Sequence, residues 1–130
     1  MAMSIGEVSA RTGLGIHTLR LYERAGLLTT ELQRDGGGRR VYTDDDAGWL
    51  VTCRILRSSG MPLAVIARFA ALVREGPGNE LERLTLLRDH EARMVSKLAE
   101  ISDARELIGA KVVLYEQHVA RGTATELWTR

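Results

Sequence analysis

The stretch that decides the fold of this chain reads IGEVSARTGLGIHTLRLYERAGLL and runs from Ile5 to Leu28. Ser4 precedes it as a candidate helix cap, and Glu7 follows three residues later, which is the spacing of a capping box. Gly13 and Gly15 interrupt the helical pattern and permit a tight turn. The pattern predicts two short helices joined by a glycine turn, the arrangement of a helix-turn-helix.

The second of these helices is expected from about residue 16 to residue 24. Ile16 and Leu19 share one face at i, i+3 spacing and are expected to be buried, whereas Arg20 points outward. Gly26 is expected to end the helix because glycine accepts the left-handed conformation found after helix C-termini. This helix therefore presents a basic outer face.

A glycine-arginine loop follows, with the sequence DGGGRRVYTDDD from Asp35 to Asp46. Residues 36–38 are expected to form a hairpin tip, and Val41 and Tyr42 lead out of it. Thr43 is expected to cap a third helix. The first turn of this helix contains three aspartates, whose negative charges are stabilised by the positive end of the helix dipole. Such a hairpin behind a helix-turn-helix is a wing, and the combination is typical of proteins that hold side chains against DNA.

Two more helices are expected to complete the domain. The third carries Trp49, Leu50, Cys53, Leu56 and Arg57 and ends at Gly60. The fourth begins near Pro62, and its apolar side consists of Leu63, Ile66, Phe69 and Ala70. The segment GPGN at residues 76–79 then breaks the helical pattern and is expected to join this domain to the rest of the chain.

Composition limits the class of protein. The chain has 130 residues, 45% of them hydrophobic, and a single cysteine, which excludes an internal disulfide framework and suggests the cytoplasm. No apolar run approaches the ~18 residues of a membrane helix, and no secretory signal segment is evident at the start. The net charge is only +1, but residues 1–43 carry six arginines against four acids. The positive excess therefore lies on the helix-turn-helix and the wing.

A heptad seam occupies the C-terminal part of the chain. Steps of three and four residues connect Leu84, Leu87, Glu91, Met94, Leu98, Ile101, Arg105, Ile108, Val112, Tyr115 and Val119. Nine of these eleven side chains are apolar, which indicates a coiled coil. A helix of about 60 Å is too long to bury this seam on a small domain, so the sequence predicts a homodimer.

The two polar seam residues indicate the direction of the pair. Glu91 and Arg105 are equidistant from Leu98, so an antiparallel pair would place Glu91 of one chain opposite Arg105 of the other, twice. A parallel pair would bury like charges against each other. The alternative is that both side chains extend out of the seam into solvent.

Together these segments resemble the MerR family of bacterial transcription regulators. The resemblance runs from Ser4 to about Val119 and rests on IGEVSARTGL, TLRLYERAGLL, GGRRVYTDDDAGWL, GMPLAVI and the long helix. It implies a mainly α fold, in which a winged helix-turn-helix DNA-binding domain precedes a long C-terminal helix that forms an antiparallel coiled-coil dimer. The boundaries expected are 3–75 for the DNA-binding domain, 76–79 for the linker, 80–120 for the dimerisation helix and 121–130 for a tail.

The candidate DNA-binding residues are Thr18, Arg20, Tyr22, Arg39, Arg40 and Tyr42, with Arg11 and His17 as weaker candidates. An arginine can bind a guanine edge or a phosphate, and hydroxyl groups can donate to phosphate oxygens. The alternative is that these residues are solvated at the surface, with the two tyrosines partly packed. The chain departs from the family at Leu21 and Arg39, where the family usually has aromatic residues.

The resemblance also implies a mode of action. Family members grip a palindrome in double-stranded promoter DNA, then bend and untwist it so that RNA polymerase engages both promoter elements. Such recognition depends on DNA shape and deformability. An effector shifts the balance between two dimer conformations.

Cys53 is the candidate for effector sensing. The sequence around it is similar to the NmlR/AdhR-like branch of the family, which responds to aldehydes and nitrosative stress through one cysteine. Arg54 and Arg57 are expected to lower the pKa of the thiol and make it more nucleophilic. The alternative is an inert core cysteine. The spacing of cysteine and histidine favours no metal site, and no cofactor is expected.

Other functional classes remain as alternatives. One is an effector-independent dimeric repressor or DNA-architectural protein, and another is a coiled-coil scaffold that has lost DNA binding. Retention of Arg20, Arg40 and Tyr42 speaks against the scaffold. An enzyme is not expected, since no paired carboxylates, nucleophile–base pair or phosphate loop is present.

Overall fold

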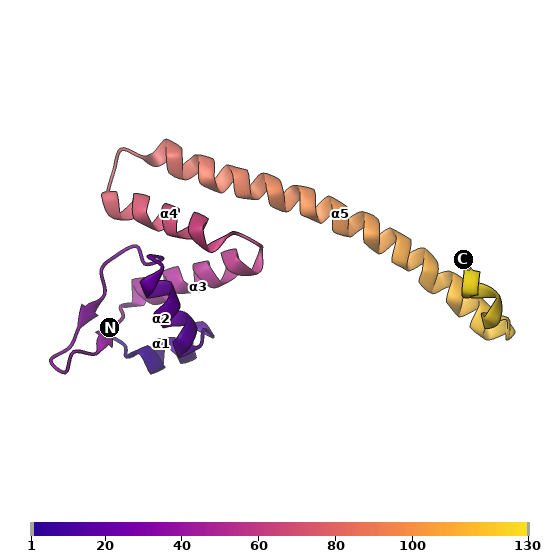
Figure 1. Cartoon of the computed structure of the whole chain (residues 1–130), viewed down its shortest axis with the longest axis horizontal. Helices are drawn as coiled ribbons and strands as arrows, with labels where there is room; N and C mark the ends of the chain where they lie inside the picture. Colours follow the sequence, from indigo (N-terminus) through magenta and orange to yellow (C-terminus); the bar gives the residue numbers. More distant parts are fainter. Residues whose placement is uncertain (1, 130) are drawn as a thin grey trace. The chain divides into compact units, whose positions relative to one another are not determined.

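The structure is a computed structural model that describes residues 2–129; the last residue of the expected tail, Arg130, lies outside the described residues. Its elements in chain order are α1 (Ile5–Thr12), α2 (Ile16–Arg24), β1 (Gln33–Arg34), β2 (Arg40–Val41), α3 (Asp44–Ser58), α4 (Leu63–Glu75), α5 (Glu80–Arg121) and the 3-10 helix η1 (Ala124–Thr129) (Figure 1). The expected fold class is confirmed: a winged helix-turn-helix followed by a long helix.

Two capping boxes fix the beginnings of α1 and α3. The Ser4 hydroxyl accepts from the Glu7 amide at 3.2 Å, and the Glu7 carboxylate accepts from the Ser4 amide at 3.2 Å. Thr43 and Asp46 repeat the arrangement at 3.1 and 2.9 Å. Asp46 is buried and also accepts from the Thr30 hydroxyl at 3.0 Å. The cap of α3 therefore also secures the loop that leads from α2 to the wing.

The turn between α1 and α2 follows the glycine pattern. Gly13 ends α1 with a φ of 76°, a conformation that other residues rarely adopt. The Thr12 hydroxyl donates to the carbonyl of Val8 at 2.8 Å and accepts from the amide of Leu14 at 3.2 Å. These bonds satisfy backbone groups that the sharp turn leaves unpaired.

The prediction of which residues of α2 are buried is partly wrong. Leu19 is 1% exposed as expected, but Ile16 is 39% exposed. Ile16 is the first residue of α2 and lies at the edge of the packed region, so the buried row continues from Leu19 to Tyr22. The expected helix end is confirmed, because Gly26 adopts a φ of 79° directly after the cap residue Ala25.

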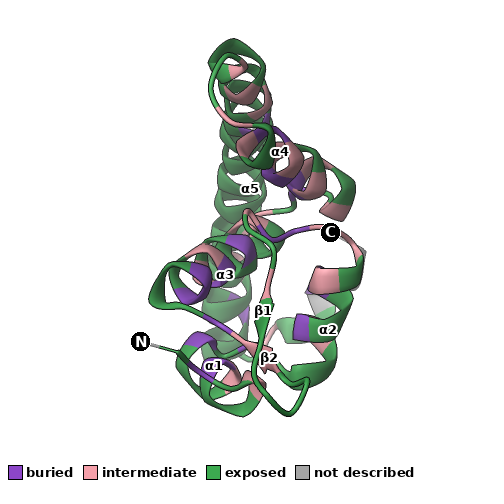
Figure 2. Cartoon of the chain, turned by 90° about the vertical axis from the view of Figure 1, so that its left-hand side faces the viewer, coloured by how far each residue is buried: buried purple, intermediate pink, exposed green. Residues whose placement is uncertain are grey.

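A hydrophobic core joins α1 to α4. Its fully buried large side chains are Val8, Leu19, Leu27, Tyr42, Leu50, Cys53, Met61 and Ile66. Trp49 closes one side of it: the indole nitrogen donates to the carbonyl of Leu27 at 2.6 Å, and the ring stacks on Phe69 at 5.8 Å. Figure 2 shows buried segments on each of α1, α2, α3 and α4.

The wing is anchored to the start of the chain. β1 and β2 pair antiparallel, with Arg34 opposite Arg40. The amide of Met3 donates to the carbonyl of Tyr42 at 2.7 Å, and the amide of Tyr42 donates to the carbonyl of Met3 at 2.8 Å. This bridge brings residue 3 beside the strand that leaves the wing.

By contacts the chain divides into two compact units, Met1–His90 and Glu91–Arg130, so the first turns of α5 belong with the DNA-binding fold. Within the first unit, Arg68 forms an ion pair with Glu82 at 2.6 Å, and the side-chain Nδ2 of Asn79 donates to the carbonyl of Leu72 at 2.8 Å. The His90 ring nitrogen Nε2 lies 2.8 Å from the Ser59 hydroxyl. These contacts fix the beginning of α5 against α3 and α4.

The nine apolar side chains of the predicted seam are all exposed in the single chain, at fractions between 38% and 65%.

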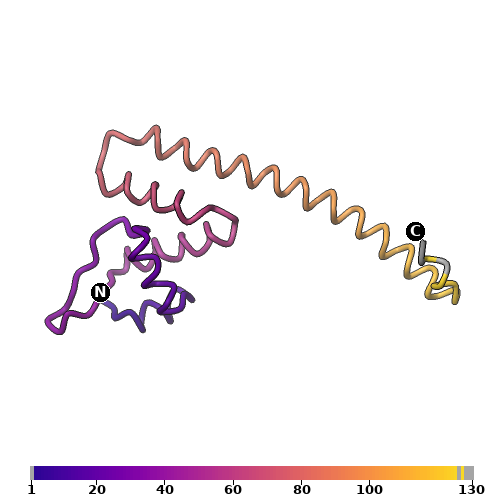
Figure 3. The backbone as a smooth tube through the Cα atoms, in the orientation of Figure 1, coloured from indigo at the N-terminus to yellow at the C-terminus, as the bar shows by residue number. Residues whose placement is uncertain are grey.

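In the second unit the backbone reverses after Arg121 (Figure 3). Gly122 adopts a φ of 71°, and the amide of Thr123 donates to the carbonyl of His118 at 2.9 Å. None of the helices in residues 2–129 is long and apolar enough to cross a membrane.

We expect Asp46→Ala to lower the free energy of unfolding by about 2 kcal/mol, because it removes a helix cap and the acceptor of the Thr30 hydroxyl. Thr52→Ala is the control: Thr52 is an exposed residue of the same helix, and the change should cost less than about 0.5 kcal/mol. Urea unfolding followed by circular dichroism, at one protein concentration, measures both. Equal stability of the two variants would contradict the role of Asp46.

Candidate nucleic-acid interface

The outer face of α2 is exposed and basic. Leu19 and Tyr22 face the core, whereas His17, Arg20 and Arg24 are exposed. Thr18 is half-buried beside them. This side of the helix carries no acidic residue before Glu23, which gives it the polarity expected of a surface that meets phosphate.

The tip of the wing is held by one side chain that sequence reasoning overlooked. The carboxylate of Asp35 accepts from the amides of Gly37 at 2.9 Å and Arg39 at 3.0 Å, and Gly38 takes a φ of 76°. An aspartate directly before glycines is a known signal for such a turn, so the motif could have been found. The consequence is that Arg39 projects from a defined tip.

A hollow of about 370 Å³ lies between the start of α1, the outer face of α2 and the wing. Its lining consists of Ser4, Ile5, Arg20, Gly38, Arg39 and Arg40. Three of the predicted DNA-binding arginines, from segments that are separate in sequence, thus meet at one place. The side chains of Arg20 and Arg39 form no ion pair with any residue in the described part of the chain.

Of the four candidate arginines, Arg40 and Arg11 each form an ion pair with an acidic residue. Arg40 donates through Nε to the carboxylate of Glu23, a residue of α2 that the sequence did not single out. Arg11 forms an ion pair with Asp44 at the beginning of α3, which lowers the pKa of that carboxyl group. Arg11 therefore lies on the α1–α3 side and does not line the hollow with Arg20.

Both candidate tyrosines lie in the core. Tyr22 is 6% exposed and Tyr42 is 1% exposed, and the Tyr42 hydroxyl is buried with no hydrogen-bond partner among the described residues. Burial raises the pKa of both phenols; the nearby guanidinium of Arg57 opposes the shift at Tyr22, and the Glu23 carboxylate adds to it at Tyr42. This agrees with the packed alternative, and phosphate contact by either ring stays a prediction.

Cys53 is fully buried in α3. Burial raises the pKa of its thiol to about 12, because transfer of a thiolate from water into the core is unfavourable. The expectation that Arg54 and Arg57 lower this pKa is therefore wrong. Arg54 is exposed to solvent, and Arg57 donates to the carbonyl of Met61 at 2.9 Å. No group of three or more His, Cys, Asp and Glu among the described residues could hold a metal ion.

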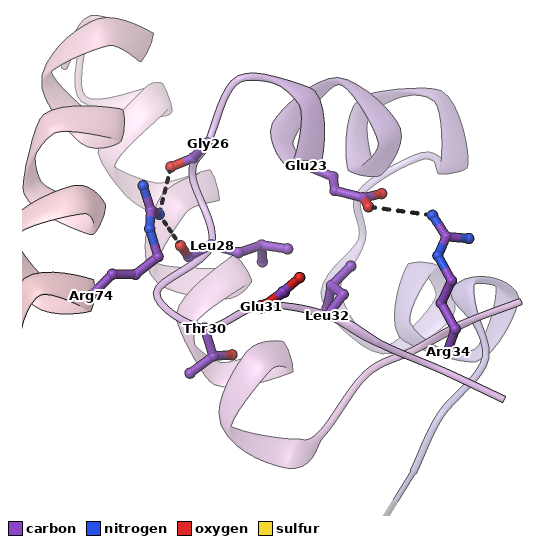
Figure 4. Close-up of a pocket in the computed structure, with 8 residues that line it drawn as sticks. All are labelled: Glu23, Gly26, Leu28, Thr30, Glu31, Leu32, Arg34 and Arg74. Atoms are coloured by element: carbon purple, nitrogen blue, oxygen red, sulfur yellow. Dashed lines mark hydrogen bonds and ion pairs between the residues drawn. The ribbon is translucent and has the colours of Figure 1, made fainter. Parts of the chain in front are cut away.

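A second hollow, of about 450 Å³, is lined by Glu23 and lies between the end of α2, the loop that follows it and the wing (Figure 4). Arg74 of α4 closes one end by donating to the carbonyls of Gly26, at 3.0 Å, and Leu28. Arg34 lies at the other end, with Nη2 4.0 Å from the Glu23 carboxylate. Arg74 thus supports the loop from which the wing extends.

Comparisons with known proteins agree with this geometry. Residues 3–72 match the MerR HTH family of regulatory proteins. An uncharacterized HTH-type transcriptional regulator of Haemophilus influenzae is 31% identical over 95% of this chain and 90% of its own. The transcriptional regulator AdhR of Bacillus subtilis is 30% identical over 72% of this chain and 66% of its own.

Solved structures give the same result. The crystal structure of HiNmlR, a MerR family regulator that lacks the sensor domain and is bound to promoter DNA, superposes with a TM-score of 0.88 at 30% identity, covering 97% of this chain and 99% of that one. A MerR family regulator from Listeria monocytogenes superposes with a TM-score of 0.86 at 26% identity, over 96% and 93%. The chain therefore belongs to the MerR family of helix-turn-helix transcriptional regulators.

Proposed function

We propose that this protein binds a palindromic operator in promoter DNA as a homodimer and distorts the DNA to control transcription by RNA polymerase. The observation that carries the proposal is the hollow in which Arg20, Arg39 and Arg40 meet between α1, α2 and the wing. It lies on a fold that matches, over nearly the whole chain, a regulator solved on promoter DNA.

In the proposed complex each element has its own task. α2 is the recognition helix, and its exposed Arg20 is placed to reach a base edge or a phosphate in the major groove. Arg39 and Arg40 on the wing hold the sugar–phosphate backbone, with Thr18 and His17 flanking on α2. Arg11 lies further away, on the α1–α3 side. Tyr22 and Tyr42 support these groups from within the core.

A second copy of the chain completes the function. The nine apolar seam residues on α5 are exposed in the single chain, and their heptad spacing fits another α5. The chain's net charge of +1 would bind phosphate weakly, whereas two DNA-binding units on one dimer double the contacts. A twofold dimer also explains why the operator would be palindromic.

The burial of Cys53 favours the effector-independent alternative over an electrophile trigger at this residue. A thiol with a pKa of about 12 is protonated at neutral pH and is a weak nucleophile. In this arrangement Cys53 serves as a small apolar side chain of α3. A regulator without a trigger would act as a repressor or as a DNA-bending protein.

We expect Arg20→Ala and Arg39→Ala each to weaken binding to the DNA upstream of the protein's own gene, and loss of a phosphate contact to lower the slope of log affinity against log salt by about one unit. Arg93→Ala is the matched control, because Arg93 is an exposed arginine on α5. Fluorescence anisotropy between 50 and 200 mM salt measures the slopes. Identical slopes for all three variants and wild type would contradict the assigned interface.

The direction of the dimer is tested by exchanging charges in the seam. Glu91→Arg should weaken dimerisation at least about tenfold, because the new arginine of each chain would lie opposite Arg105 of the other chain, which places two like-charged pairs in the seam. Adding Arg105→Glu should restore it. Sedimentation equilibrium gives the dissociation constants. A double variant no tighter than the single one would exclude the antiparallel pairing, and single variants equal to wild type would favour side chains that extend out of the seam.

Reactivity of Cys53 distinguishes the two modes of control. At pH 8 iodoacetamide should modify the folded protein at least about 100-fold more slowly than the urea-unfolded chain, because only the unfolded thiol, with a pKa near 9.0, forms appreciable thiolate. Mass spectrometry follows the reaction. Transcription in vitro should respond equally to methylglyoxal in wild type and Cys53→Ala. Rapid modification, or a response lost in Cys53→Ala, would establish the trigger instead.

A further inference from the structure

Glu23 is the single acidic residue of α2, and it lies among arginines of the helix and the wing, where an acid opposes the attraction of phosphate. It belongs to α2, three residues after Arg20, and its side chain is 25% exposed. We propose that Glu23 is a positioning residue that fixes the wing against the recognition helix and lowers affinity for non-specific DNA. The proposal rests on the proposed DNA-binding function.

One carboxylate of Glu23 contacts both strands of the wing. Its Oε2 accepts from Nε of Arg40 on β2, and its Oε1 lies 4.0 Å from Nη2 of Arg34 on β1. Arg34 and Arg40 are directly opposite each other in the two-stranded sheet. Figure 4 shows the Glu23 and Arg34 side chains pointing toward each other across the gap between α2 and the wing. The wing therefore has a charged attachment to the helix besides its backbone contacts at Met3.

The attachment also orients Arg40. A guanidinium has five N–H donors in a rigid plane. Because Nε is bound to Glu23, rotation of the guanidinium is restricted, and Arg40 still lines the hollow that it shares with Arg20 and Arg39. The remaining donors are thus oriented before DNA arrives. A lysine at this position could supply the charge but not the fixed plane.

Tyr42 lies close to this ion pair. Its side chain is 1% exposed, and the charges of Glu23, Arg40, Asp46 and Arg20 all act on its hydroxyl. The ion pair itself is only partly accessible to solvent, with 28% of the Arg40 side chain and 25% of the Glu23 side chain exposed.

Specificity follows from charge and from rigidity together. Glu23 offsets one of the positive charges that would otherwise attract any duplex, since non-specific affinity depends on the number of phosphates neutralised. A fixed wing binds fully only where the backbone path of the DNA fits it, which is a form of shape readout. Loss of the carboxylate would release both wing arginines and make binding stronger on arbitrary sequences.

The test uses Glu23→Gln, which keeps the volume of the side chain and removes its charge. Affinities of the full-length protein are measured for the promoter duplex and for a scrambled duplex of equal length, between 50 and 200 mM salt. We expect affinity for the scrambled duplex to rise at least about threefold, its salt slope to steepen by about one unit, and promoter affinity to gain less, so that the specificity ratio falls.

Glu31→Gln is the matched control. Glu31 is an exposed acid near the wing, and its substitution changes the net charge by the same amount as Glu23→Gln. It forms no ion pair in the described part of the chain. It should leave the specificity ratio at the wild-type value. If both variants shift the two duplexes equally, the effect is one of general charge, and the proposal is overturned.

Arg40→Lys provides a second test that changes no net charge and guards against misfolding of the first variant. It should lower the specificity ratio because the oriented guanidinium plane is lost. An unchanged ratio in Arg40→Lys or Glu23→Gln would overturn the positioning role. If wild-type protein binds promoter and scrambled duplexes equally, it is the proposed function that fails, whatever the variants do.

Discussion

The buried carboxylate of Asp46 is the constraint on which the geometry of the DNA-binding fold depends. It caps α3 together with Thr43, and it accepts from Thr30 in the loop that leads to the wing. The start of α3 and the approach to the wing are therefore tied to one point. Because an unpaired buried carboxylate is costly, the two segments must adopt their positions together. Thr43 directly follows Tyr42, which is hydrogen-bonded to Met3 where the chain leaves the wing.

The positive charge of this protein is concentrated on one face, and acidic residues neutralise part of it there. The chain is nearly neutral, yet the face formed by α2 and the wing concentrates arginines, some free and some paired. The pairs Arg40–Glu23 and Arg11–Asp44 each join two elements of the fold, and the cation in each is one that the sequence suggested for DNA. Such pairs leave fewer free positive charges on the surface, so recognition depends more on the positions of the remaining donors than on total charge.

Sequence patterns predicted the features that arise from neighbouring residues. The capping box at Ser4, the cap at Thr43, the turns at Gly13 and Gly26 and the bounds of α2 depend on residues within four positions of one another. The glycine-arginine loop predicted the wing, and the heptad spacing predicted the long helix. The part that could not be predicted arises from contacts between distant segments. The Glu23–Arg40 pair spans seventeen positions, and no spacing rule connects its members.

The error at Cys53 has the same origin. Arg54 and Arg57 are neighbours of Cys53 in the sequence. On the helix, however, Arg54 is exposed to solvent and Arg57 binds the carbonyl of Met61, whereas the thiol of Cys53 is buried in the core. Desolvation then outweighs charges that are close only along the chain. The buried tyrosines are a second example: Leu19 and Tyr22 share one face of α2 at i, i+3 spacing, and the apolar ring of Tyr22 is buried although it carries a hydroxyl group.

The bridge between Met3 and Tyr42 determines how the beginning of the chain can be handled. Because residue 3 is hydrogen-bonded beside the wing, and Ser4 and Ile5 line the basic hollow, any polypeptide attached ahead of Met3 starts at the edge of the DNA-binding face. An affinity tag rich in acidic residues would compete there with phosphate, and a polyhistidine tag would add cationic character at mildly acidic pH. A tag placed after the second unit starts instead beyond η1, which lines no part of that hollow.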